Sequence, residues 1–261
     1  MLDTIQYLLG ALSGSLVGFS LGLFGGGGSI LAVPLMVYLV GVPVAHVAIG
    51  TSALAVAANA AAGLASHARQ GNVIWRCSLM FSVAGIAGAI LGSMLGKALD
   101  GQKLLFLFAL VMIFVGVRML RGRETEGTPG AQCDRGNAPK VLAAGGLTGL
   151  FSGFFGIGGG FLIVPGLIAS TGMPILNAIG SSLVAVTAFG LTTAASYAFS
   201  GLVDWPLAAA FIAGGVAGGM LGSIAARRLS NRKGVLSTAF AVLVFAVAGY
   251  MLWQSGQTLL C

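Results

Sequence analysis

The stretch GFSLGLFGGGGSILAVPL, from Gly18 to Leu35, returns later in the chain as GLFSGFFGIGGGFLIVPG, from Gly149 to Gly166. A shift of 131 residues places Gly22 on Gly153 and aligns the glycine clusters and a proline behind each of them. Two further motifs repeat in the same order: AIGTSA at 48–53 matches AIGSSL at 178–183, and GNVIW at 71–75 matches GLVDW at 201–205. The chain is therefore an internal duplication, a feature typical of transporter folds.

Composition places these repeats in a membrane. Of 261 residues, 57% are hydrophobic and only 7% are charged, whereas soluble domains carry about 25% charged residues. The apolar residues form runs of about 18–25, the length that crosses a hydrocarbon core of roughly 30 Å. The net charge of +7 does not indicate nucleic-acid binding, because the basic residues cluster between apolar runs and are typical of topology signals. We expect an all-α integral membrane protein.

The apolar segments divide into two halves of roughly five each, joined by a polar stretch. We expect a first transmembrane repeat at 1–121, a cytoplasmic connector at 122–138 and a second repeat at 139–261. The segments 28–41 and 160–172 are short, and each follows a glycine cluster and contains a proline. We therefore expect 5–41 and 139–172 to be helical hairpins with glycine-rich tips, spanning the membrane fully or in part.

The basic residues favour inverted repeats. An odd number of crossings per half puts 11 basic residues on one face and leaves only Lys97 and Lys103 opposite, whereas an even number gives 7 against 6. Because cytoplasmic loops are enriched in Lys and Arg, the first arrangement is favoured, with both termini outside. The two hairpins would then enter from opposite faces, and their tips could approach each other.

These tips are the predicted substrate site. A helix N-terminus presents unpaired N–H groups and partial positive charge, and glycine lets an anion approach the backbone closely. We expect substrate contacts from the following tip residues: Gly25, Gly26, Gly27, Gly28 and Ser29 in the first half, and Gly156, Gly158, Gly159 and Gly160 in the second. The alternative is that these glycines serve only turns and close packing.

Hydroxyl and amide side chains supply further candidates. Thr51, Ser52 and Asn59 lie along one predicted helix, and Ser181 and Ser182 occupy the matching helix of the second half. Such donors suit a partly desolvated oxyanion. Hydrogen bonding between membrane helices is the alternative for the hydroxyls.

The remaining polar residues indicate little chemistry. His46 and His67 are expected near opposite faces, where either could carry a proton, although interfacial histidines are the commoner case. The three cysteines show no metal or CxxC spacing and are interpreted as isolated thiols. All six acidic residues fall outside the predicted span interiors. We find no enzyme signature and expect no cofactor and no bound metal.

The doubled pattern GxxxGxxGxGGG, a following proline, a GTS or GSS triplet and G-x-V-x-W resembles the TauE/SafE sulfite-exporter family. The resemblance covers nearly the whole chain, although the first tip reads GGGG where the second reads GIGGG. It implies a multi-pass transporter of the bacterial inner membrane that carries sulfur oxyanions or organosulfonates, commonly in export.

We therefore expect a secondary transporter, in the direction of export, for small sulfur-containing anions such as sulfite or organosulfonates. An anion channel and a non-transporting membrane scaffold are the alternatives. The expected partners are the small anion and membrane lipid, with protons as a candidate coupling ion and without nucleic acid. The sequence leaves the oligomeric state open.

Overall fold

The computed structural model describes residues 3–121, 133–134, 136–156, 160–229 and 235–260, and this part of the chain is helical without strands. In the first half the helices are α1 (Thr4–Phe24), the 3-10 helix η1 (Gly25–Leu31), the single turn α2 (Ala32–Pro34), the π-helical η2 (Leu35–Leu39), α3 (Ala45–Arg69), α4 (Trp75–Ala98) and α5 (Gly101–Arg121). In the second half they are α6 (Ala138–Phe155), α7 (Gly160–Thr171), α8 (Ile175–Phe199), α9 (Trp205–Leu229) and α10 (Val235–Leu260).

Length and composition make these helices membrane helices. Within the described residues, 5 stretches are long and apolar enough to cross a bilayer: Thr4–Leu39, Ala45–Arg69, Trp75–Ala98, Ile175–Phe199 and Trp205–Ala225. A helix of 25 residues is about 37 Å long, which exceeds the roughly 30 Å of hydrocarbon. The predicted all-α integral membrane fold is confirmed.

The surface is apolar where a soluble protein would be polar. On α1 the side chains of Leu8, Leu12 and Leu16 are more than half exposed and follow one another at helical spacing. The opposite face of α1 carries Gly10, Gly14, Gly18 and Gly22. A helix with exposed leucines on one face and glycines on the other contacts lipid outside and packs closely inside.

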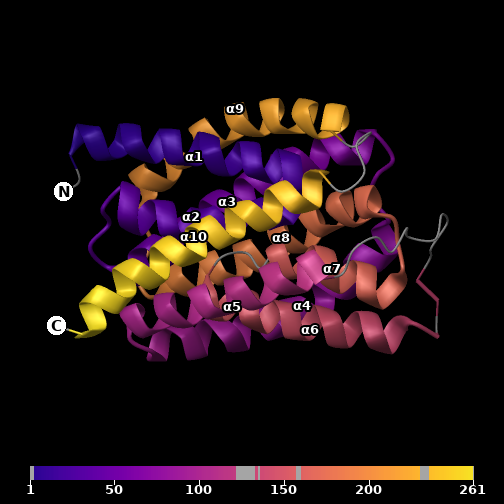
Figure 1. Ribbon diagram of the computed structural model, residues 1–261. Coiled ribbons are helices and arrows are strands. Elements are labelled where there is room, and N and C mark those ends of the chain that lie inside the picture. The colour runs from indigo at the N-terminus through magenta and orange to yellow at the C-terminus, as the bar shows by residue number, and fades with distance from the viewer. Residues whose placement is uncertain (1–2, 122–132, 135, 157–159, 230–234, 261) are drawn as a thin grey trace.

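The two halves exchange partners in their packing. α1 packs along α9, and α6, which is the repeat equivalent of α1, packs along α4, which is the equivalent of α9. Figure 1 shows α1 and α9 together along one edge of the bundle and α4 and α6 together along the opposite edge. Each half therefore completes its packing only against the other half.

Both predicted hairpins are present. The Gln6 side chain near the start of α1 donates to the Val40 carbonyl at 3.0 Å, so the segment after the first tip returns to the end where it began. In the second hairpin, a Cβ built at Gly166 of α7 would lie 3.4 Å from the Thr148 methyl of α6. The first returning limb is irregular: it is 3-10 helical from Gly25 through Leu31 and π-helical after Pro34, which supplies no backbone N–H.

Equivalent helices run in opposite directions. His46, in the first turn of α3, lies 3.1 Å from the carbonyl of Leu99 just after α4. Lys97, in the last turn of α4, contacts Ser196 and Ser200 at the end of α8. The start of α3 and the end of α8 therefore meet at one end of the bundle. The start of α1 and the end of α10 also lie at one end of the bundle in Figure 1. The pattern agrees with the inverted arrangement, whose orientation in a membrane stays a prediction.

Candidate functional site

The tips begin at two glycines in unusual backbone conformations. Gly25 follows α1 with a φ of 64°, and Gly156 follows α6 with a φ of 69°, a region that side chains other than glycine rarely adopt. A Cβ at Gly25 would lie 2.7 Å from a methyl of Ile179 on α8, and one at Gly156 would collide with Ile49 on α3. Each of these two positions therefore requires glycine for two reasons: its positive φ, and the lack of space for a side chain.

The two tips touch each other. A Cβ built on Gly26 would lie 2.9 Å from the Cα of Gly160 and 2.7 Å from a methyl of Val186, and one built on Gly160 would collide with the Gly26 carbonyl. Both glycines are buried. The predicted approach of the tips is confirmed at this pair. Gly158 and Gly159 lie outside the described residues, and Gly27 and Gly28 lie buried within η1.

Ser182 attaches the first tip to α8. Its hydroxyl accepts from the Gly26 N–H at 3.1 Å and donates to the Ile179 carbonyl at 2.7 Å. Within the tip, the Ser29 hydroxyl donates to the Gly26 carbonyl at 2.9 Å. Both serines are completely buried. The predicted residues Gly26, Ser29 and Ser182 thus form one polar group together with Gly160.

Thr51 and Ser181 have other partners, which are equivalent in the two halves. The Thr51 hydroxyl accepts from the Asp204 N–H at 2.9 Å, and the Ser181 hydroxyl accepts from the Ile74 N–H at 2.9 Å. Asp204 and Ile74 directly precede α9 and α4, so each hydroxyl satisfies a backbone donor at a helix start in the other half. Thr51 and Ser181, both predicted substrate contacts, thus each accept a backbone N–H at the start of a helix.

Ser52 and Asn59 occupy two further positions on α3. The Ser52 hydroxyl donates at 3.0 Å to the carbonyl of Ile49, which is the residue that packs on Gly156. Asn59 is 5% exposed, and a Cβ at Gly215 of α9 would collide with its amide. Neither the nitrogen nor the oxygen of that amide has a partner among the described residues. A buried amide without a partner costs about 1–3 kcal/mol, and a substrate contact from Asn59 stays a prediction.

Several buried hydroxyls share this property and were missed by the sequence reasoning. Hydroxyl oxygens without a partner among the described residues belong to Ser13, Ser20, Ser82, Ser152, Thr193 and Tyr197. Their sequence context gave no signal, because hydroxyl side chains are ordinary at contacts between membrane helices.

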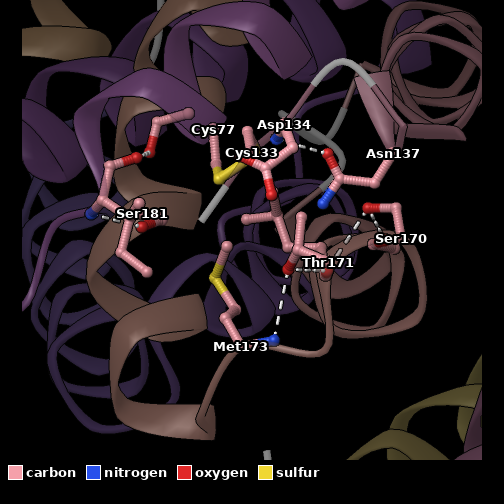
Figure 2. Close-up of a disulfide and its surroundings, with 12 residues drawn as sticks. Cys77, Cys133, Asp134, Asn137, Ser170, Thr171, Met173 and Ser181 are labelled. Atoms are coloured by element: carbon pink, nitrogen blue, oxygen red, sulfur yellow. Dashed lines mark hydrogen bonds between the residues drawn. A yellow bond between two sulfur atoms is a disulfide. The ribbon is translucent and has the colours of Figure 1, made fainter. Parts of the chain in front are cut away.

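One expectation about the cysteines is wrong. Cys77 at the start of α4 and Cys133 form a disulfide with a Cα–Cα distance of 5.3 Å, across 56 residues of sequence. Figure 2 shows this disulfide together with Ser181 and with Thr171 at the end of α7. Spacing along the chain could not indicate the pair, because the packing of α4 on α6 brings the cysteines together. Cys261 lies outside the described residues.

The histidines occupy opposite ends of α3. The His46 ring lies beside the ring of Tyr197, with 6.3 Å between centroids, and His67 is buried in the last turn of α3. The predicted proton role of either residue stays a prediction.

Comparisons with known proteins agree along the whole chain. Residues 10–251 match the family described as "Sulfite exporter TauE/SafE". A relative from Xylella fastidiosa strain 9a5c is 54% identical over 98% of this chain and 99% of its own length. Relatives from Haemophilus influenzae (32% identical over 74% of each chain) and Bacillus subtilis (YunE, 26% identical over 89% of this chain and 91% of its own) are more distant. All three are named as probable membrane transporter proteins. No solved structure matches the chain.

Proposed function

Because the chain belongs to the sulfite exporter TauE/SafE family, we propose that it is a secondary transporter that exports small sulfur-containing anions such as sulfite or organosulfonates. The family and the transporter relatives identify a membrane transporter rather than an enzyme. The apolar helices are those of a multi-pass protein of the bacterial inner membrane. The sulfur anion, the direction and the binding site are the proposal.

The contact between Gly26 and Gly160 carries the proposed binding site. At this point two broken hairpins from different halves present backbone rather than side chains to each other. Gly160 begins α7, a helix of 12 residues, whose first N–H groups have no intrahelical partner. Discontinuous helices that place their N-termini at the repeat interface are how many secondary transporters hold an anionic group.

The groups around the Gly26–Gly160 contact suit an anion that is bound and then released. The groups around the tips are backbone amides and the hydroxyls of Ser29 and Ser182, together with the apolar side chains of Ile179 and Val186. In this arrangement the O–H groups of Ser29 and Ser182 donate to carbonyls, so the donors left for an oxyanion are the N–H groups at the start of α7. These neutral donors hold an anion without the stronger attraction of a buried ion pair. Such a site selects small oxyanions and releases them when the tips separate.

Transport then requires the two hairpins to move relative to each other. Rocking of one repeat against the other around a fixed site is the common mechanism for inverted repeats. The Ser182 hydrogen bond to Gly26 joins a tip of the first half to a helix of the second. We propose that this bond and the Gly26–Gly160 contact define a closed state, and that their separation opens the path.

The first test is anion flux in proteoliposomes containing the purified chain. The panel is sulfite, thiosulfate, sulfoacetate and taurine, with acetate as the control, with and without a pH gradient. Saturable flux with counterflow of one sulfur anion supports a carrier, and dependence on the gradient supports proton coupling. Flux without counterflow supports a channel. No flux from folded protein overturns the proposed substrate class and favours a scaffold or a different substrate.

The second test addresses the tips. Gly26→Ala brings a methyl group against Gly160 and Val186, so we expect it to lower the flux at least about tenfold, equivalent to about 1.4 kcal/mol. Ser182→Ala removes the acceptor of the Gly26 N–H and should lower the flux without adding volume. Gly249→Ala on α10, whose Cβ would meet nothing within 4 Å, is the matched control. Unchanged flux in both tip variants would refute the tip site.

A further inference from the structure

Lys97 lies half-buried in the last turn of α4, with its ammonium on the end of α8. Its Nζ donates to the Ser196 carbonyl at 3.0 Å and to the Ser200 hydroxyl at 3.1 Å, and it lies 5.7 Å from the centroid of the Tyr197 ring. The Ser93 hydroxyl also donates to the Ser196 hydroxyl at 2.9 Å. A positive charge and three serine hydroxyls are thus gathered at one end of the bundle.

No described carboxylate neutralises the charge of Lys97. Both of its hydrogen bonds go to uncharged oxygens, and no carboxylate in the described part of the chain pairs with it. An ammonium has three N–H donors, so one remains for another acceptor. By the topology argued from the sequence, Lys97 also lies on the face that holds only 2 of the 13 basic residues, where orientation signals do not explain a lysine.

A short series of contacts leads from this cluster to the second glycine tip. The Cβ of Tyr197 packs against Gly50, whose neighbour Ile49 packs against Gly156. His46, one helical turn before Ile49, lies beside the same tyrosine ring. Lys97 is therefore connected to Gly156, where the second tip begins, through Tyr197, Gly50 and Ile49.

The second half carries a basic residue at the matching position. LGSMLGKAL at 91–99 corresponds to LGSIAARRL at 221–229, so Lys97 falls on Arg227 with the shift of 130 residues that also relates the two triplets. The side chain of Arg227 lies outside the described residues. In an inverted arrangement, the two positions would flank the tips from opposite faces.

We propose that Lys97, with Ser196 and Ser200, forms a cationic mouth where the transported oxyanion binds transiently between the outer face and the second tip. The proposal rests on the proposed anion transport. A fixed charge at the mouth raises the local concentration of anions, and its effect weakens as salt screens it. The remaining N–H of Lys97 and the O–H of Ser196 add hydrogen bonds that an oxyanion accepts, whereas the Ser200 O–H donates to the Ser196 carbonyl at 3.2 Å.

A purely structural role makes a different prediction. Lysine near a helix C-terminus can simply satisfy a terminal carbonyl, as Lys97 does for Ser196. That role needs a hydrogen-bond donor and not a charge. Lys97→Gln keeps a donor and removes the charge, whereas Lys97→Arg keeps the charge, so the pair separates the two roles.

The experiment measures the concentration dependence of uptake into proteoliposomes, using whichever sulfur anion of the panel gives saturable flux with the wild type. We expect Lys97→Gln to raise the KM about three- to tenfold, with the maximal rate within about twofold, since the mouth concerns capture rather than translocation. Lys97→Arg should stay near wild type. The difference should shrink at high ionic strength. Lys103→Gln, an exposed lysine at the start of α5, is the control.

An unchanged KM in Lys97→Gln, or an equal rise in Lys103→Gln, overturns the cationic mouth and leaves the proposed transport standing. Saturable flux in the wild type with a lower maximal rate alone in Lys97→Gln also overturns it, because that result indicates a role in the moving or folding of the helices. Absence of flux in the wild type overturns the proposed substrate class and this inference together.

Discussion

At the scale of single residues, neighbouring hydroxyls in the triplets GTS at 50–52 and GSS at 180–182 bind different partners. The middle residue of each, Thr51 or Ser181, accepts a backbone N–H just before a helix of the other half. The last residue of the second triplet, Ser182, instead accepts the Gly26 N–H in the tip of the other half. Adjacent hydroxyls on one helix thus serve the helix ends and the tip, a division that depends on which side chain faces which neighbour.

The capping role predicts a graded effect on stability. Ser181→Ala leaves the Ile74 N–H without its acceptor and should cost about 0.5–2 kcal/mol, whereas Ser181→Thr retains the hydroxyl, as Thr51 does at the matching position. The measurement is thermal unfolding of the detergent-solubilised protein. Equal melting temperatures for the alanine and threonine variants would argue against the cap.

At the scale of elements, glycine sets how closely the exchanged helix pairs approach. A Cβ at Gly18 of α1 would collide with the backbone of Gly215 on α9, and a Cβ at Gly92 of α4 would collide with that of Leu150 on α6. Without a hydrophobic driving force between helices in lipid, such close contact is a main source of their association.

Gly18→Ala should therefore destabilise the protein, because a methyl group cannot enter without separating two backbones. Overpacking typically costs about 1–3 kcal/mol. Gly63→Ala on α3 is the control, since its Cβ would make only an ordinary contact of 3.5 Å with Leu183 and alanine favours the helix. Thermal unfolding in detergent should rank Gly18→Ala below Gly63→Ala, and the reverse order would contradict close packing as the source of stability.

The disulfide is also a property of elements, because it joins the start of α4 to the residues just before α6. We expect Cys77 and Cys133 to resist a thiol-reactive polyethylene glycol until the unfolded protein is reduced. Cys77→Ala should make Cys133 reactive without reduction. The loss of stability should stay below the about 4 kcal/mol of an entropic cross-link of this length, because helices that remain in the bilayer already restrict the unfolded chain. An adduct at Cys77 or Cys133 in the unreduced wild-type protein would exclude the disulfide.

At the scale of the whole molecule, the prediction that matters is inversion. Gln70 after α3 and Ser200 after α8 are exposed and occupy matching positions. With inverted repeats, Gln70→Cys and Ser200→Cys should react with a membrane-impermeant thiol reagent from opposite faces, in a background without the native cysteines. Labelling from the same face would indicate parallel repeats and would also remove the topological part of the argument for Lys97.

The sequence by itself determined the membrane class, the duplication and the glycine breaks. These are local properties: apolar length, residue spacing and the φ angles that only glycine adopts readily. Even the limits of the hairpins follow from them, since α1 ends at Phe24 and α6 at Phe155, each directly before a tip glycine.

The tertiary structure alone decided which repeated features meet. The caps at Thr51 and Ser181, the pairing of Cys77 with Cys133 and the position of Lys97 on α8 all join residues far apart in the chain. No local pattern encodes such contacts, because they depend on how each half packs against its counterpart. Two related halves each carry glycine-lined helix faces, and only the packed bundle selects α1 with α9 and α4 with α6.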